Sequence, residues 1–342
     1  MGWKTIFGSR RAFGVAGFCC GGAPVVAFWA CASLFVIPPR RECEPRHRET
    51  LARPADFGFS IDRFTAAGGD SGVQLEAALL TPVAEPGEAV KTRRMLQRLQ
   101  AVGVKPTVPG SYRGTVVMLH GRGGIKEHAF PVAERFVAAG FRCLIYDARA
   151  HGESGGTYCT YGFRERADLR AVIDAAQLRY GRDELGPLLA FGISQGAAVV
   201  LQSLPDEPRL RAAVTVAPFA ELSPVAAGAV GRVAGAWVPD WLRKWVVDGG
   251  GWLAGFPPSA IRPVAVAPAI PVPVMVVHGD RDSVIPLEHG RRIYDALGGA
   301  GKLWRPVVGG THGAVLATGG DDLYLEMILF WIGALEASQH AP

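Results

Sequence analysis

The residues best suited to chemistry in this sequence centre on one serine between two glycines. The stretch GISQG, residues 192–196, joins an apolar strand-type run to an Ala/Val/Leu run typical of a helix. A sharp turn between a strand and a helix projects the Oγ of Ser194 clear of the backbone and tolerates only small neighbours. Because neutral serine is a weak nucleophile, the pattern predicts covalent catalysis only if a base, an orienting acid and oxyanion donors occur elsewhere.

Two further strand ends offer the donors and the acid. One apolar run ends in HGRGG, residues 120–124, where the glycines let the amide of Arg122 turn inward beside that of Gln195 as oxyanion donors. An ordinary glycine-rich turn is the alternative, and in either case the arginine side chain need not take part. A second apolar run precedes Asp280 and Asp282. We predict Asp282 as the orienting acid, since the next helix begins shortly after it, whereas Asp280 fits a turn.

The base is predicted by position along the chain. His289, His312 and His340 are the histidines that follow the predicted acid. His289 falls in a predicted helix and His340 lies close to the C-terminus, so His312, in the loop sequence GGTHG, is the one free to reach Ser194. The expected chemistry is acyl transfer through an acyl-enzyme, which needs no metal and no organic cofactor.

Strand-type and helical runs alternate from residue 114 onward, which is typical of a mostly parallel sheet covered by helices. Several of the strands are apolar throughout, as expected where both faces are covered. An antiparallel hairpin, 60–66 and 73–82, precedes them. The predicted parallel strands are 115–120, 142–147, 187–194, 212–218, 272–279 and 303–310, and the predicted helices are 127–140, 163–181, 195–204, 287–299 and 321–335.

The order Ser194, Asp282, His312, each at a strand end, resembles the α/β-hydrolase superfamily, and the resemblance runs from about Phe59 to Leu335. It implies an α/β-hydrolase fold with helices on both faces of the sheet, a lid insertion and a serine hydrolase activity. One departure is Ala197, where many relatives carry a third glycine. The stretch YDARAHGESGG is similar to the superfamily's common turn after the fourth strand, which implies structural roles for Asp147, Arg149, His151 and Ser154.

The N-terminal part reads as a membrane segment. Residues 12–39 carry no charge and are long enough for one transmembrane helix, which needs about 20 apolar residues. A cleaved signal peptide is the alternative, because ACA at 30–32 has the form of a cleavage site. We therefore expect a single-pass anchor, with the side of the membrane open, and a membrane-anchored hydrolase related to prolyl-oligopeptidase-like and acylglycerol-lipase-like enzymes. The expected organisation is an anchor at 1–39, a polar spacer at 40–58, a hydrolase domain at 59–336 and a tail at 337–342.

The break in the alternation at about 221–270 is the predicted lid. Within it, Trp237, Trp241 and Trp245 recur every four residues and would share one face of a helix. They could wall an acyl chain, rest on a membrane, or pack on their own domain. We expect hydrolysis of hydrophobic acyl esters or thioesters. The alternative is a serine exopeptidase of prolyl-oligopeptidase type, which needs an acidic anchor for a free amino group; Glu153 and Glu221 are the residues to examine.

Composition excludes other classes of function. A net charge of +5 over 342 residues is too small and too local to indicate nucleic-acid binding. The 6 cysteines show no paired metal-ligand spacing and no disulfide-scaffold density, so no metal site is predicted. The sequence gives no indication of an oligomeric state. The expected partners are a small or lipid-like acyl substrate and a membrane.

Overall fold

The computed structural model describes residues 22–69, 72–85, 87–108, 110–235 and 237–339. In these residues the chain forms an eight-stranded sheet with the order β1-β2-β4-β3-β5-β6-β7-β8. The β1–β2 and β2–β4 pairs are antiparallel, and the other strand pairs are parallel. The strands are β1 Phe59–Ala67, β2 Gln74–Pro82, β3 Gly114–Leu119, β4 Phe141–Tyr146, β5 Leu188–Ile193, β6 Leu210–Val216, β7 Val274–Gly279 and β8 Leu303–Val307.

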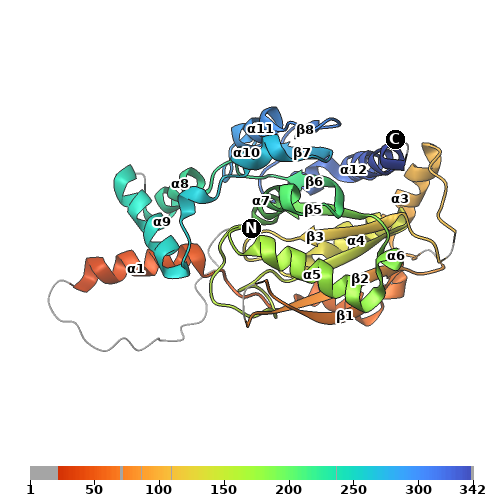
Figure 1. Ribbon diagram of the computed structural model, residues 1–342, viewed down its shortest axis with the longest axis horizontal. Helices are drawn as coiled ribbons and strands as arrows, with labels where there is room; N and C mark the ends of the chain where they lie inside the picture. The colour runs from red at the N-terminus through yellow and green to blue at the C-terminus, as the bar shows by residue number, and fades with distance from the viewer. Residues whose placement is uncertain (1–21, 70–71, 86, 109, 236, 340–342) are drawn as a thin grey trace.

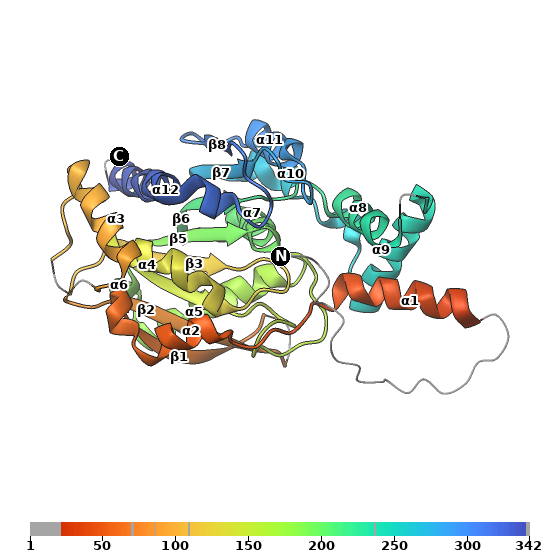
Figure 2. The ribbon, with the colours of Figure 1, turned by 180° about the vertical axis from the view of Figure 1, so that it is seen from behind.

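Helices cover both faces of the sheet, as the continuously apolar strands predict (Figures 1 and 2). One hydrophobic core lies between the sheet and α3, α4 and α12, and the other between the sheet and α5, α7 and α11. The predicted α/β-hydrolase fold is therefore present. The helices of this domain are α3 Val90–Ala101, α4 Phe130–Ala138, α5 Glu165–Tyr180, α6 Arg182–Leu185, α7 Gln195–Ser203, α10 Pro263–Val266, α11 Leu287–Ala296 and α12 Val315–Gln339.

The predicted lid is a helical lobe between β6 and β7. It contains α8 Leu222–Ala234 and α9 Asp240–Ala254, and the N-terminal helix α1 Gly22–Val36 lies alongside α9 (Figures 1 and 2). The close approach depends on glycine. A Cβ at Gly250 would come within 2.8 Å of the Ala32 carbonyl oxygen, and one at Gly249 within 2.9 Å of the Phe28 ring. The bare face of α9 is therefore shaped to receive α1.

The tryptophans of the lobe differ from the predicted arrangement. Trp237 lies in the turn before α9 because the helix begins after Pro239, which caps it and has no N–H to donate. Trp241 and Trp245 share the helix, and their rings touch with centroids 5.4 Å apart. The exposed fractions are 81% for Trp237, 59% for Trp241 and 61% for Trp245. The alternative in which they pack on their own domain is therefore wrong.

The N-terminal region also departs from the expected organisation. Within the described residues no helix combines the length and the apolar character needed to cross a membrane; α1 has 15 residues, and residues 12–21 of the predicted span lie outside the described part. The predicted spacer at 40–58 contains regular structure. It folds as α2 Pro45–Ala52 and the 3-10 turn η2 Pro54–Phe57, and Leu51 and Phe57 pack against the core of the domain because their apolar side chains are better buried.

Candidate active site

Ser194 occupies a strained turn at the end of β5. Its φ of 54° and ψ of −115° lie outside the usual regions for a non-glycine residue, and its amide donates to the Val216 carbonyl over 2.8 Å. The flanking glycines make the turn possible. A Cβ at Gly192 would come within 2.5 Å of the Gly196 carbonyl oxygen, and one at Gly196 within 2.4 Å of the Leu119 carbonyl oxygen. Packing against β3 and α7 therefore fixes the serine at the carboxyl edge of the sheet.

The structure brings Ser194, His312 and Asp282 together from three separate loops. The Nε2 of His312 lies 3.0 Å from the Oγ of Ser194, and its Nδ1 lies 2.7 Å from the Oδ2 of Asp282. These distances are those of a base that hydrogen-bonds a nucleophile and is oriented by a carboxylate. His312 is partly exposed and the Asp282 carboxylate is buried. We call the three residues the triad.

The acid of the triad is held ionised by its surroundings. Burial alone would raise the pKa of Asp282, but hydrogen bonds from His278, His312 and the Ile285 amide outweigh it and hold the pKa below its ordinary value. The amides of Val284 and Ile285 donate to Oδ1 over 2.9 and 2.8 Å. Oδ2 is therefore left to accept from the imidazole.

His278 is a positioning residue that the sequence pattern does not reveal. It is fully buried at the end of β7, its Nε2 donates to the Ile285 carbonyl over 2.8 Å, and the same nitrogen lies 3.5 Å from Oδ2 of Asp282. It thus ties the loop that carries the acid to the strand. The other histidines and the second aspartate lie elsewhere. Asp280 accepts the Gly309 amide in a turn, and His289 accepts the Ala220 amide, whereas His340 lies outside the described residues.

The predicted oxyanion donors belong to two segments beside the nucleophile: a Cβ at Gly121 would lie 3.4 Å from the Cβ of Ser194, and Gln195 follows Ser194 directly. In the described part of the chain, no hydrogen bond occupies the amides of Arg122 and Gln195. Gln195 is the first residue of α7, where amides have no partner within the helix and the helix dipole favours negative charge. The other predicted donor, Arg122, lies in the loop of residues 120–124, which we call the oxyanion loop. His120 fixes this loop: its Nε2 accepts the Ala148 amide over 3.0 Å, and its Nδ1 lies 2.8 Å from the Gly121 carbonyl oxygen. The loop conformation is thereby fixed ahead of catalysis.

The side chain of Arg122 takes part in the architecture, contrary to the sequence-based expectation. Its guanidinium donates to the carbonyls of Leu34 and Ile37 at the end of α1. This contact links the oxyanion loop to a segment more than 80 positions earlier in the chain, so local sequence carries no signal for it. Charge-assisted hydrogen bonds of this kind are stronger than neutral ones.

Residues 34–40 form a segment, here called the strap, that packs against the loop of residues 120–124 and against residues 152–161. The Val36 carbonyl accepts the Cys159 amide over 2.8 Å, and the Phe35 carbonyl accepts the Tyr161 hydroxyl over 2.6 Å while the two rings stack. Pro39 packs on Gly123 in the oxyanion loop. Arg40 then donates to the carbonyls of Gly152, Ser154 and Gly156, over 3.0, 2.6 and 2.7 Å. The strap is therefore bonded to the loop that carries Arg122 and to the turn after β4, and it is not a loose connection.

We expect substitution of Arg122 to slow the reaction, because it removes the hydrogen bonds between the strap and the loop of residues 120–124. Arg122→Ala keeps the backbone donor but removes its tether, so kcat should fall by about 10- to 50-fold, less than the roughly 100- to 1,000-fold cost of losing an oxyanion donor. Arg291→Ala, an exposed arginine on α11 paired with Asp295, is the matched control and should change kcat by less than about twofold. Steady-state kinetics with one activated ester measure both. Equal rates for the two variants would contradict the tether.

The predicted structural turn after β4 has the role expected of it. Asp147 accepts the Lys126 and Glu153 amides and the Lys126 ammonium, and Ser154 donates to the Asp147 carbonyl over 2.6 Å. Arg149 forms a buried ion pair with Asp168. His151 is fully buried, and burial together with the neighbouring His120 lowers its pKa to about 3. The turn is a rigid support behind the oxyanion loop.

The depressed pKa of His151 predicts acid sensitivity. Its folded pKa lies below the unfolded value of about 6.5, so between about pH 3 and 6.5 the unfolded chain binds the extra proton and stability falls as the pH falls. One such histidine contributes up to about 1.4 kcal/mol per pH unit in that window. His151→Asn cannot ionise and should flatten the dependence of the unfolding free energy on pH, measured by urea unfolding at pH 7.5, 6.0 and 5.0. An unchanged slope would exclude this residue as a source.

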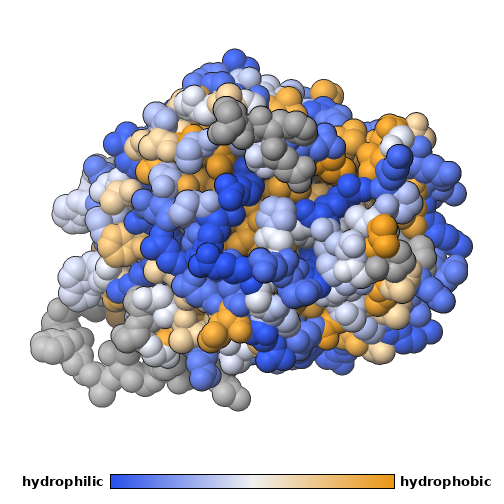
Figure 3. Space-filling model, turned by 45° about the vertical axis from the view of Figure 1, so that its right-hand side comes forward, coloured by the Kyte–Doolittle hydropathy of each residue, from blue (hydrophilic) through white to orange (hydrophobic). Residues whose placement is uncertain are grey.

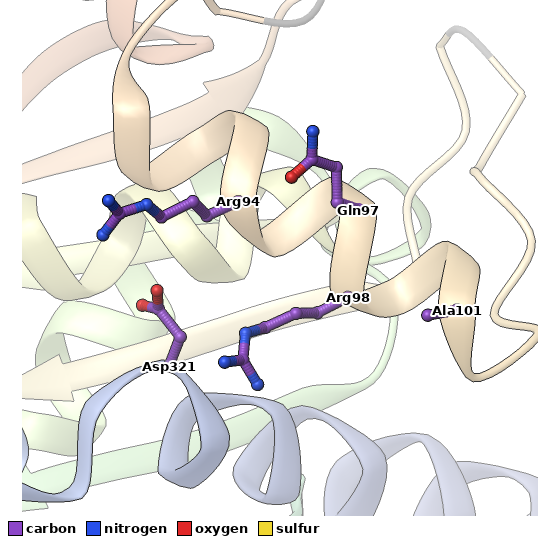
Figure 4. Close-up of a pocket in the computed structure, with 5 residues that line it drawn as sticks. All are labelled: Arg94, Gln97, Arg98, Ala101 and Asp321. Carbon is purple, nitrogen blue, oxygen red and sulfur yellow. The ribbon is translucent and has the colours of Figure 1, made fainter.

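A separate hollow lies between α3 and α12, at the end of the domain away from α8 and α9, and is lined by Arg94, Gln97, Arg98, Ala101 and Asp321 (Figures 1 and 4). Arg98 is paired with Asp322 and Asp321 with Arg135, so these charges are already satisfied. In the face shown in Figure 3, hydrophilic residues form a band across the surface with separate hydrophobic groups around it. No part of this hollow belongs to the triad.

The sheet order is that of the α/β-hydrolase fold, and the strained serine with its relay of hydrogen bonds has the arrangement of a serine hydrolase active site. Residues 110–251 match the serine aminopeptidase S33 family model. The chain is 28% identical over 204 residues to the uncharacterised YqkD protein of Bacillus subtilis strain 168, covering 57% of this chain and 64% of that protein.

Two further proteins are similar to this chain. The quorum-quenching protein AidA of Acinetobacter baumannii strain MDR-ZJ06 is 33% identical over 113 residues, which is 31% of this chain and 36% of AidA. Among solved structures, the Pyrococcus furiosus esterase Pf2001 is similar with a TM-score of 0.63 and 21% identity, covering 87% of this chain and 99% of the esterase. The chain therefore spans less than two thirds of these two curated relatives, whereas it aligns with nearly the whole of the esterase fold.

Proposed function

We propose that this enzyme hydrolyses ester or thioester bonds of hydrophobic acyl substrates at a membrane surface. His312 takes the Ser194 proton as the hydroxyl attacks the carbonyl, and the amides of Arg122 and Gln195 stabilise the oxyanion. Protonated His312 is stabilised by Asp282 and then protonates the leaving group. Water activated by the same imidazole releases the acid from the acyl-enzyme. The observation that carries this proposal is the continuous relay from Asp282 through His312 to Ser194.

The acidic side chains near the site favour an esterase over an exopeptidase. Both carboxylate oxygens of Glu221 are engaged, one by Arg262 at 3.0 Å and the other by Arg292 at 2.9 Å. Glu153 pairs with buried Lys126 at 2.5 Å. Arginines thus hold both oxygens of Glu221 and a lysine holds one oxygen of Glu153, so each of the two carboxylates already has a cationic partner. The serine aminopeptidase match keeps exopeptidase activity as the second candidate, with the same triad.

The helical lobe supports a hydrophobic substrate. It follows β6 directly and is joined to the site through the strap, and its core contains Tyr161, Phe219, Leu222 and Phe256. Phe35 stacks on Tyr161 at 5.0 Å, so α1 contributes an aromatic ring to this region. The same cluster includes Ala198, whose amide donates to the Ser194 carbonyl over 3.1 Å, so apolar side chains extend to the helix that follows the nucleophile, which suits an acyl chain.

The outer surface of the lobe supports a membrane location. We call Trp29, Trp237, Trp241, Trp245 and Trp252 the tryptophan surface; their exposed fractions run from 37% to 81%. Trp29 of α1 contacts Trp252 of α9 with ring centroids 5.5 Å apart. Tryptophan is enriched where proteins meet the interface of a bilayer. We infer that this surface rests on lipid, next to the N-terminal apolar segment. The proposed location is a single-pass anchor, or a secreted form if the segment is cleaved.

The activity is tested with purified full-length chain. A fluorophosphonate probe should label the protein, and p-nitrophenyl esters of increasing chain length should be cleaved faster than aminoacyl-nitroanilides. Rates that rise with chain length from two to about eight carbons support the acyl wall. Efficient cleavage of aminoacyl-nitroanilides with little ester hydrolysis would favour the exopeptidase.

The membrane proposal needs its own measurement. In a flotation assay, protein lacking residues 1–21 should bind anionic and zwitterionic vesicles. The same protein with the double substitution Trp241→Ser/Trp245→Ser should not bind them. Leu178→Ser removes an apolar side chain from α5 that is even more exposed than either tryptophan, and it serves as the control. Full-length protein should also stay with membranes after carbonate washing. Vesicle binding that is unaffected by the tryptophan substitutions would contradict a role for the tryptophan surface.

A further inference from the structure

A second cluster of reactive side chains lies behind the oxyanion loop and belongs to no part of the triad. Glu44 and His47 come from the N-terminal end of α2, and His128 comes from the 3-10 turn η3 Lys126–Ala129. One possible ligand atom from each of the three lies within 4.8 Å of the others. The Nε2 of His128 is 3.3 Å from Oε1 of Glu44, and the two imidazole centroids are 5.4 Å apart.

His47 supplies an independent reason to expect a ligand. It is 3% exposed, and its Nδ1 has no hydrogen-bond partner. Buried polar nitrogen is rarely left without a partner, because the group loses its hydrogen bonds to water and gains none in return. His47 also packs against the ring of Phe130, so the imidazole is fixed in place rather than free to turn toward solvent.

The donor set suits zinc. Two imidazoles and one carboxylate are ligands that zinc accepts, with water in the remaining position of a tetrahedral site. The His128 and Glu44 side chains are partly exposed, so the cluster has an open side for entry and for a water ligand.

The neighbouring cations set a limit on the affinity. Arg46 takes Oε2 of Glu44 at 2.8 Å, which leaves Oε1 toward the imidazoles, and Arg41 lies 3.9 Å from Oε1. Both arginines are more than half exposed, so solvent screens their repulsion of a divalent ion. A micromolar site is the expected result, weaker than closed structural zinc sites with thiolate ligands.

We propose that Glu44, His47 and His128 bind one divalent ion of the zinc class, which fastens α2 to the catalytic domain. The ion would join α2 to η3, two elements that are far apart in the sequence. α2 follows the strap by only a few residues, and η3 follows the oxyanion loop directly. Metal binding at this position therefore fixes the strap relative to the oxyanion loop. It adds a metal to a chain for which the sequence predicted none, and it leaves the chemistry of Ser194 unchanged.

The test measures metal binding directly on the full-length chain. After chelator treatment and buffer exchange, zinc is titrated in competition with a chromophoric chelator, and Co²⁺ is added separately to record its visible absorption. Wild type should bind one equivalent of zinc, and Co²⁺ should give bands of a tetrahedral or five-coordinate site with nitrogen ligands. Glu44→Gln and His128→Gln should each weaken zinc at least tenfold. Glu49→Gln, an exposed glutamate on the same helix, should bind like wild type.

Stability gives the second readout. Because a ligand that binds only the folded chain stabilises it, zinc at a large excess over its dissociation constant should raise the melting temperature of wild type and Glu49→Gln by several degrees. It should not do so for Glu44→Gln or His128→Gln, which keep partly exposed side chains and are expected to fold. Absence of one-equivalent binding in wild type, or equal binding by all four proteins, overturns the proposal. Both outcomes are independent of esterase activity.

Discussion

Ser194→Ala should abolish turnover of activated esters, lowering kcat by about 10⁴- to 10⁶-fold while the protein stays folded. The hydroxyl is the only group in the described structure that meets Nε2 of His312, at 3.0 Å, so nothing else there can form the acyl-enzyme. The remaining rate should come from the oxyanion amides and from substrate binding. Alanine adds no bulk at the strained position, so the melting temperature should stay within a few degrees of wild type.

The measurement combines steady-state hydrolysis with fluorophosphonate labelling. Ser60→Ala, on the exposed side of β1, is the matched control and should retain both activity and labelling. Loss of labelling in Ser194→Ala alone identifies the nucleophile. Labelling of both variants to the same extent would assign the reactive group to another residue and remove the basis of the proposed mechanism.

Asp282→Asn should lower kcat by about 10⁴-fold, because an amide at this position favours the wrong tautomer of His312 and cannot stabilise the imidazolium. The effect is large because both oxygens of the carboxylate are in use. Oδ1 accepts hydrogen bonds from two amides, and Oδ2 lies 2.7 Å from Nδ1 of His312. The hydrogen bonds that lower the pKa of Asp282 keep it ionised throughout the range in which the enzyme would be assayed.

Asp280→Asn provides the sharpest control, since the two aspartates are separated by a single residue. Asp280 accepts the Gly309 amide over 2.7 Å, a bond that the oxygen of asparagine can keep. Its kcat should stay within about threefold of wild type. Similar losses in both variants would mean that the loop as a whole, rather than the carboxylate of Asp282, supports the reaction.

Local patterns in the sequence carry most of the fold. Continuous apolar runs predict the strands β3 to β7 to within a few residues, because strands covered on both faces must be apolar along their whole length. The three residues of the triad could also be predicted from sequence, since each follows a predicted strand and parallel strands bring their carboxyl ends to one edge of the sheet. The sequence pattern does not predict the helix start after Pro239, because the four-residue spacing of Trp237, Trp241 and Trp245 favours one continuous helix across the proline.

The remaining features depend on contacts between distant parts of the chain. The guanidinium of Arg122 binds carbonyls of the strap, and α1 packs on Gly249 and Gly250 of α9, but an arginine or a glycine run does not indicate its partner. His278 reads as one more residue of a buried strand, and His47 as part of a polar linker. Each acquires its role only when the fold places a second group beside it.

The strap has a consequence for maturation of the protein. The small-residue motif at 30–32 lies upstream of it, so removal of a leader after Ala32 would leave residues 34–40 attached to the domain. The protein with its leader and the processed protein would then keep the same strap contacts. The carbonyls that bind Arg122 and the side chain of Arg40 are present in both forms. What processing would remove is most of α1, and with it the aromatic cover on the bare face of α9. Release from a membrane and exposure of that face would then be one event.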